Sequence, residues 1–172
     1  MKRKRLLKII WFIVKLDLFL IPLILLLQMD FSYEPFQNIL ASAVSSTLKF
    51  IGYSSAASSY YITVAFGKTI EVIDISMDCT GWKSAYALTA LAVATPAVWK
   101  KRLKFLLAGI PAIFFINYIR IVSTIAYAQK FGLATLEVIH SVLWQEGLVA
   151  AVLALWFLWL WSGKKGVKLL IS

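Results

Sequence analysis

The sequence predicts a mainly α, integral membrane protein with four transmembrane helices, an extracytoplasmic amphipathic helix and a short β-hairpin, in a single membrane domain over residues 1–172. Of the 172 residues, 61% are hydrophobic and the mean hydropathy is +0.82. A soluble domain is roughly 45–50% apolar. Runs of about 20 mostly apolar residues, which are long enough to cross a bilayer, lie at about 9–27, 79–99, 105–127 and 138–161.

The positive charges predict how these spans are oriented. The chain has 18 Lys and Arg against 8 Asp and Glu, an excess that in a soluble protein would suggest a nucleic acid partner. Most of these Lys and Arg residues instead form three clusters between the apolar runs, at residues 2–8, 100–104 and 164–168. Cytoplasmic loops are rich in Lys and Arg. We therefore expect a multi-pass protein of the cell (plasma) membrane with both termini cytoplasmic and no nucleic acid partner.

The first span, residues 9–27, follows a basic start and so resembles a secretory signal. The apolar core of a signal peptide is only about 7–15 residues and precedes a cleavage site of small residues. This run is longer, and no such site follows it. We interpret it as a membrane span.

The extracytoplasmic insert, residues 28–78, is too long for a simple loop. Residues 35–50 have a helical period, and the serine-rich run after Gly52 is expected to end this helix. Residues 60–66 and 69–75 are rich in β-branched and aromatic side chains around Gly67-Lys68, a two-residue hairpin connection. This amphipathic helix is expected to lie on the membrane or to pack on the helix bundle. Its apolar face is expected to consist of Phe36, Ile39, Leu40, Ala43, Val44, Thr47 and Leu48.

Three polar residues on three different spans are expected at the outer third of the bilayer. Cys79, the only cysteine, begins the second span, Arg120 lies seven residues before Tyr127 in the third, and His140, the only histidine, starts the fourth. Taken singly, a membrane cysteine is usually an apolar filler, a histidine near a helix end is usually interfacial, and an arginine can snorkel. Their common depth favours one catalytic site at the outer face.

The chemistry of these side chains fits a cysteine hydrolase or transferase. A thiol becomes a nucleophile as a thiolate, and its pKa falls beside a cation or at a helix N-terminus. Cys79 is expected at such a start, with Lys83 one turn later. The imidazole of His140 could exchange the proton and Arg120 could stabilise an oxyanion. Glu137 or Asn117 could orient His140, although helix-end solvation and interhelical hydrogen bonding explain them equally well.

Other charged residues fall inside the predicted spans. Glu146 lies near mid-membrane, where a charge is paired or protonated, and we expect a structural pair with Lys83 or Arg120. Lys15 and Asp17 of the first span have no partner evident in the sequence.

The chain resembles the exosortase/archaeosortase family in its second half. The resemblance rests on Cys79-Thr80-Gly81 opening a transmembrane helix, the basic turn at 100–104, Asn117-Tyr118-Ile119-Arg120-Ile121 in the next helix and His140 in the following one. It implies that Cys79 is the nucleophile, with Arg120 as the second catalytic residue and His140 as the third. That third position is histidine in exosortases and arginine in some archaeosortases.

The resemblance also implies the reaction. Such enzymes cut a C-terminal sorting signal, consisting of a short motif, a transmembrane helix and a basic tail, from exported proteins. The new C-terminus passes through a thioester to an amine acceptor, a membrane lipid in our expectation. No cofactor and no metal are expected. Two alternatives stay open: a cysteine protease that hydrolyses without transfer, and a non-enzymatic small transporter or assembly factor in which Arg120, Glu146 and Asp17 line a polar path.

Overall fold

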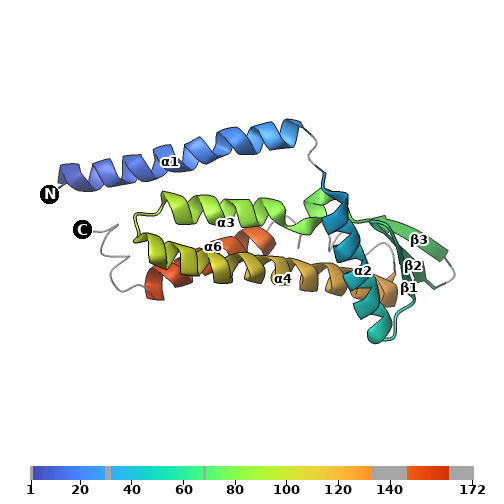
Figure 1. Cartoon of the computed structure of the whole chain (residues 1–172). Coiled ribbons are helices and arrows are strands. Elements are labelled where there is room, and N and C mark those ends of the chain that lie inside the picture. Colours follow the sequence, from blue (N-terminus) through green and yellow to red (C-terminus); the bar gives the residue numbers. More distant parts are fainter. Residues whose placement is uncertain (1, 30–31, 68, 133–146, 163–172) are drawn as a thin grey trace. The chain divides into compact units, whose positions relative to one another are not determined.

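A computed structural model describes residues 2–29, 32–67, 69–132 and 147–162 (Figure 1). Contacts within the chain divide it into two compact units. Unit 1 comprises Met1–Phe31, Lys83–Ala112 and Ala150–Ser172, and unit 2 comprises Ser32–Trp82 and Ile113–Val149.

Two helices of the described residues are long and apolar enough to cross a membrane. Helix α1 covers Lys2–Gln28, and the segment Leu6–Gln28 has a mean hydropathy of 2.5 with none of it buried. Helix α4 covers Trp99–Phe131 and contains the second candidate span. Since a helix that is apolar on all sides needs an apolar environment, the predicted spans 9–27 and 105–127 are confirmed as candidate spans.

The second predicted span is wrong in extent. Residues 79–99 contain a short 3₁₀ turn, η1 (Met77–Thr80), then helix α3 (Trp82–Ala94), and no single long helix. Gly81 breaks the run with a left-handed φ of 83°, and Pro96 follows the end of α3. At 1.5 Å per residue α3 is about 20 Å long, less than the roughly 30 Å of a bilayer core. Four spans are therefore not established.

The basic cluster at 100–104 does not form the turn between helices. It lies in the first turns of α4, and residues 95–98 form the connection from α3. Arg102 donates to three carbonyls of this connection and the end of α3: Nε to Ala92 at 3.0 Å, and Nη2 to Thr95 at 3.1 Å and Ala97 at 3.4 Å. The cluster thus has a structural member as well as exposed lysines.

The last helix, α6, covers Leu148–Ser162. The earlier part of the predicted span 138–161 lies mostly outside the described residues. Within unit 1, Trp156 donates from Nε1 to Thr95 Oγ1 at 3.0 Å, and the rings of Phe105 and Trp159 stack with centroids 4.5 Å apart. The helices of this unit run side by side (Figure 1).

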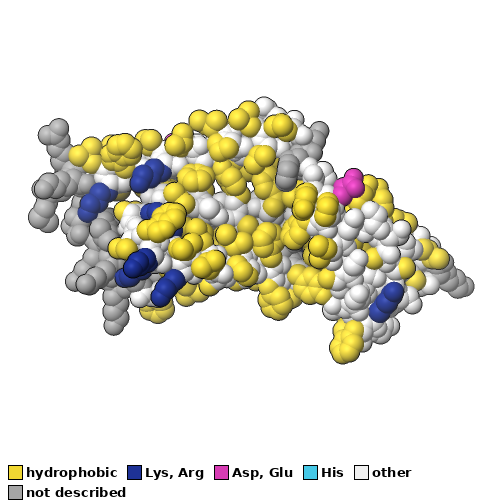
Figure 2. All heavy atoms as spheres, viewed as in Figure 1, with side chains coloured by type: hydrophobic (Ala, Val, Ile, Leu, Met, Phe, Trp, Pro, Cys, Tyr) yellow, Lys and Arg dark blue, Asp and Glu magenta, His cyan; other side chains and the backbone are white. Residues whose placement is uncertain are grey.

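Basic side chains gather at the end where α1 and α4 begin, and the surface beyond them is largely apolar (Figure 2).

Unit 2 contains the amphipathic helix, α2, at Glu34–Phe50. Its existence is confirmed. Of the predicted face, Ile39 is 66% exposed and Ala43 is also exposed, so these two residues are not part of the core of unit 2. Two polar residues take buried places: Gln37 donates to the Ile75 carbonyl at 2.9 Å, and the Ser45 hydroxyl lies 3.1 Å from that of Ser55. The buried residues of α2 are Gln37, Ala41, Val44, Ser45 and Leu48.

A three-stranded antiparallel sheet follows α2, in the order β1-β2-β3. The predicted hairpin is confirmed as β2 (Tyr61–Phe66) and β3 (Thr69–Asp74), with Phe66 opposite Thr69. Strand β1 (Ser55–Ser58) pairs with β2 and was missed, since Ser-Ala-Ala-Ser has no β-branched or aromatic side chain. One face of β2 joins α2 and the second half of α4 in a core that includes Val44, Leu48, Ile62, Val64, Phe66, Ile121 and Ile125.

Candidate active site

Cys79 lies in the η1 turn, ahead of α3, and does not begin the helix as predicted. Its backbone N–H donates to the Ser76 carbonyl at 2.9 Å, and the Ser76 hydroxyl donates to its Sγ at 3.4 Å. The Thr80 hydroxyl donates to the Met77 carbonyl at 2.7 Å. These local bonds fix the thiol at the point where the chain leaves β3. Ser76 was not identified from the sequence as part of the site. The only sign of its role in the sequence is that it is a polar residue three positions before Cys79.

Asn117 of α4 holds the same turn from the other side. Its Nδ2 donates to the Cys79 carbonyl at 2.7 Å, and its side chain is 1% exposed. A Cβ on Gly81 would lie 3.0 Å from Asn117 Cγ, so glycine serves both the left-handed backbone and the close approach of α4. The sequence suggested Asn117 as a partner of His140, whereas in the structure it binds the backbone of the cysteine.

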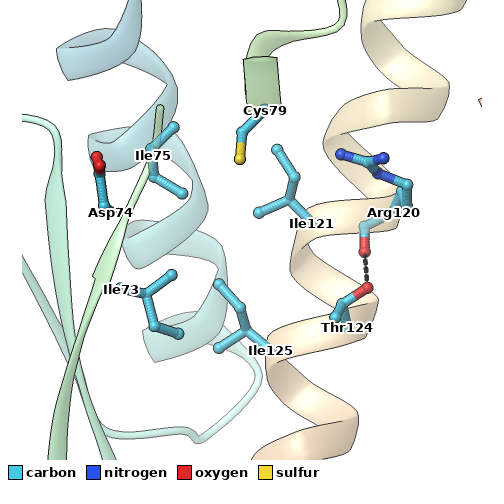
Figure 3. A pocket seen from close by; sticks show the side chains of 8 residues that line it. All are labelled: Ile73, Asp74, Ile75, Cys79, Arg120, Ile121, Thr124 and Ile125. Atoms are coloured by element: carbon cyan, nitrogen blue, oxygen red, sulfur yellow. Dashed lines mark hydrogen bonds between the residues drawn. The ribbon is translucent and has the colours of Figure 1, made fainter. Parts of the chain in front are cut away.

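Arg120 lies one turn after Asn117 on α4, and its guanidinium points toward the Cys79 sulfur (Figure 3). Both residues line one cavity of about 250 Å³. The Thr124 hydroxyl donates to the Arg120 carbonyl at 2.8 Å (Figure 3). The structure thus brings together two of the three predicted site residues. The complete lining is Ile73, Asp74, Ile75, Cys79, Arg120, Ile121, Thr124 and Ile125.

The polar residues of the lining are Cys79 and Arg120, Thr124, whose hydroxyl is bonded to the Arg120 carbonyl, and Asp74. Four isoleucines line the rest, two from β3 and the residue after it, and two from α4. No sequence pattern indicated this cavity, because its walls come from segments about fifty residues apart. Asp74 is exposed at the sheet edge, beyond Ile75 (Figure 3).

The pKa of the Cys79 thiol is raised from its ordinary value, because burial penalises the charged thiolate. The hydrogen bond from Ser76 and the positive charge of Arg120 both lower this pKa, but by less than burial raises it. Cys79 lies outside both candidate spans. Cys79 does not stand at a helix start, so the predicted contribution of a helix N-terminus does not apply, whereas a neighbouring cation, Arg120, lowers the pKa as expected.

The other predicted participants do not join this cavity within the described residues. His140, Glu137 and Glu146 lie outside those residues. Lys83 belongs to α3 in unit 1, and Lys15 and Asp17 are exposed on α1. Across the ranges that the structure describes, no three His, Cys, Asp or Glu side chains lie close enough to hold a metal ion.

Comparison with known proteins gives one result. Residues 2–160 match the family model described as transmembrane exosortase. Neither the curated proteins nor the solved structures contain a match to this chain. The matched region covers almost the whole sequence and includes Cys79, Arg120 and His140. The chain therefore belongs to the transmembrane exosortase family.

Proposed function

We propose that this protein is a membrane cysteine transpeptidase that cleaves a C-terminal sorting signal from exported proteins and transfers the new C-terminus to an amine. The observation that carries the proposal is the placement of the Cys79 sulfur and the Arg120 guanidinium in one cavity (Figure 3). A thiol beside a fixed cation suits acyl transfer, because the reaction forms an anionic intermediate. Membership of the exosortase family supports the same reaction class.

In the first half of the reaction, Cys79 loses its proton to a base, which we assign to His140 by the family resemblance. The thiolate attacks the scissile carbonyl carbon, and the oxyanion that forms is stabilised by Arg120. The C–N bond then breaks, the leaving amine takes the proton, and the acyl group stays on Cys79 as a thioester. Burial supports the need for a separate base, since it raises the pKa of this thiol.

In the second half, an amine attacks the thioester carbonyl. The base accepts a proton from the attacking amine, the C–S bond breaks, and Cys79 returns as the thiolate. A membrane lipid with a primary amine is our assignment for the acceptor, because the thiol lies in a chain with apolar, membrane-length helices. Water as the acceptor would give the hydrolysed product instead.

The substrate class follows from the proposed orientation. We assign both termini to the cytoplasm and the active site to the outer face of the plasma membrane. The gathering of basic side chains at the start of α1 and α4 supports the cytoplasmic assignment for that end (Figure 2). A substrate helix with a basic tail inside would then present its recognition motif at the level of Cys79.

Replacement of Cys79 in the native host tests this function. In a Cys79→Ala strain, we expect membrane proteins with a C-terminal helix and basic tail to accumulate at full length, as measured by mass spectrometry of their C-termini. Ser58→Ala, an exposed change on β1, is the matched control. Unchanged processing in the Cys79→Ala strain would exclude the proposal and favour the transporter or assembly factor.

The same spectra separate transfer from hydrolysis. After transfer, the C-terminal peptide is heavier by the mass of the attached amine, less one water. After hydrolysis, the same peptide ends in a free carboxylate and carries no added mass. If every processed C-terminus in the wild-type strain is a free carboxylate, the protein is a cysteine protease that does not transfer the acyl group.

A further inference from the structure

The cavity beside Cys79 has more room than the two reactive side chains need. Its volume of about 250 Å³ lies below the roughly 300–1,000 Å³ of sites that enclose whole small molecules. An apolar cavity of about 150 Å³ is enough to hold benzene. The space therefore corresponds to one side chain of a larger ligand.

The lining defines the chemistry of that side chain. Ile73 and Ile75 reach the cavity from β3 and the residue after it, and Ile121 and Ile125 from α4 (Figure 3). Ile75, Ile121 and Ile125 are at most 6% exposed and belong to the core of unit 2. Walls fixed in a packed core form a preformed pocket. A polar side chain placed against the four isoleucines would lose its hydrogen bonds to water without gaining new ones from them.

We propose that this isoleucine cavity is a specificity subsite, which binds one apolar side chain of about leucine size from the substrate residue next to the scissile bond. The inference rests on the proposed function, because the cavity opens onto the thiol assigned as nucleophile. Arg120 and Cys79 at one end would meet the peptide carbonyl, and the isoleucines would hold the neighbouring side chain. Burial of that side chain supplies binding energy and sets the distance between carbonyl and sulfur.

The experiment uses the full chain in lipid nanodiscs and three chloroacetamides, N-methyl, N-isobutyl and N-carboxymethyl, as probes. Each alkylates a thiol, since Sγ displaces chloride and the proton goes to solvent. Cys79 is the only cysteine, so the added mass reports this site alone. Relative to their rates with glutathione, we expect the isobutyl probe to react about tenfold faster than the methyl probe, and the carboxymethyl probe more slowly.

Two adjacent residues of β3 provide matched variants. Ile73 lines the cavity, whereas Val72 projects from the opposite face of the sheet and is 62% exposed. Ile73→Phe fills the cavity and should remove the isobutyl preference, and Val72→Phe should keep it. Thr124→Leu fills the same space from α4 and should act as Ile73→Phe does. Because each result is a ratio of two probes on one sample, it is independent of the yield of folded protein, and comparison with Val72→Phe corrects for probe partitioning into lipid.

Equal normalised rates for the methyl and isobutyl probes in the wild type would overturn the inference, as would an isobutyl preference that survives both filling variants. The outcome is separate from the test of Cys79 in the host. A preference for the isobutyl probe together with normal processing in the Cys79→Ala strain would exclude the proposed reaction. Loss of processing without any probe preference would exclude the subsite alone.

Discussion

Asn117 donates a hydrogen bond from Nδ2 to the backbone carbonyl of Cys79 across 2.7 Å, and so couples α4 to the turn that presents the thiol. The Asn117 side chain is buried, and its Oδ1 accepts no hydrogen bond from the part of the chain that the structure describes. The position of Cys79 thus depends on a residue 38 positions away.

Asn117→Ala tests this coupling. Loss of the donor leaves a carbonyl without its partner, at a cost of about 1–3 kcal/mol in stability. It also frees the turn, and displacement of a reacting group by about 1 Å can reduce a rate on the order of 10²-fold. We expect a fall in kcat for processing with little change in KM. Asn38 lies on α2 and accepts a hydrogen bond from the Ser59 hydroxyl, and Asn38→Ala should leave kcat unchanged. An equal loss of kcat in both variants would mean that Asn117 has only a structural role.

Gly81→Ala tests the close approach of α4 to the turn. A left-handed backbone costs a residue with a Cβ roughly 1–2 kcal/mol, and at Gly81 the Cβ would also contact Asn117 at 3.0 Å. Gly52 has a φ of 93°, and a Cβ at that position would have no neighbour within 4 Å, so Gly52→Ala isolates the backbone cost. We expect Gly81→Ala to lower both Tm and processing more than Gly52→Ala. Equal effects on processing would argue against the contact.

Ser76→Ala tests the control of thiolate formation. The Ser76 hydrogen bond lowers the pKa of Cys79 against the larger effect of burial, so its removal should raise that pKa further. Since only the thiolate reacts, the pH profile of alkylation by iodoacetamide should move to higher pH, with the same rate at its alkaline plateau. The higher pKa lowers the thiolate fraction at neutral pH, so the rate there should fall. Ser58→Ala is the control, and an unmoved profile in Ser76→Ala would contradict the assigned bond.

Arg120→Lys tests the role of the guanidinium. Lysine keeps the charge but lacks the planar fork of donors, so stabilisation of an oxyanion should weaken. We expect kcat to fall by about 10²–10³-fold, the usual effect of losing one such donor, with membrane abundance unchanged. Lys130→Ala, an exposed change at the far end of α4, serves as the control. Wild-type kcat in Arg120→Lys would remove Arg120 from the mechanism.

Arg102→Ala tests the structural member of the basic cluster. Its three bonds hold carbonyls at and after the end of α3, and hydrogen bonds to charged groups contribute about 1.5–3 kcal/mol each. We expect a fall of several degrees in the Tm of the detergent-solubilised protein. Lys101 is exposed, and Lys101→Ala should change Tm little; similar Tm values for the two variants would show that the cluster acts through charge alone.

Local properties of the sequence were sufficient for much of the fold. Hydropathy predicted α1 and the membrane-length part of α4, and the alternation of β-branched residues predicted β2 and β3 with their two-residue connection. Each of these signals lies within one short segment. The pairing of Cys79 with Arg120 was also predictable, because a cysteine and an intramembrane arginine are both rare enough to be noticed.

Only the tertiary structure decided how the thiol is held. A side chain at position 81 would collide with Asn117. Two buried polar residues of α2 find their partners in distant segments: Gln37 donates to the Ile75 carbonyl, and the Ser45 hydroxyl is hydrogen-bonded to that of Ser55. The isoleucine cavity arises where β3 meets α4. The periodicity of apolar residues predicts which face of a helix is apolar. It does not predict which distant backbone group forms a hydrogen bond with a buried polar atom. For that reason the sequence determined which residues are candidates for the chemistry, and the packing of α4 against the η1 turn and β3 decided the geometry of Cys79 and Arg120.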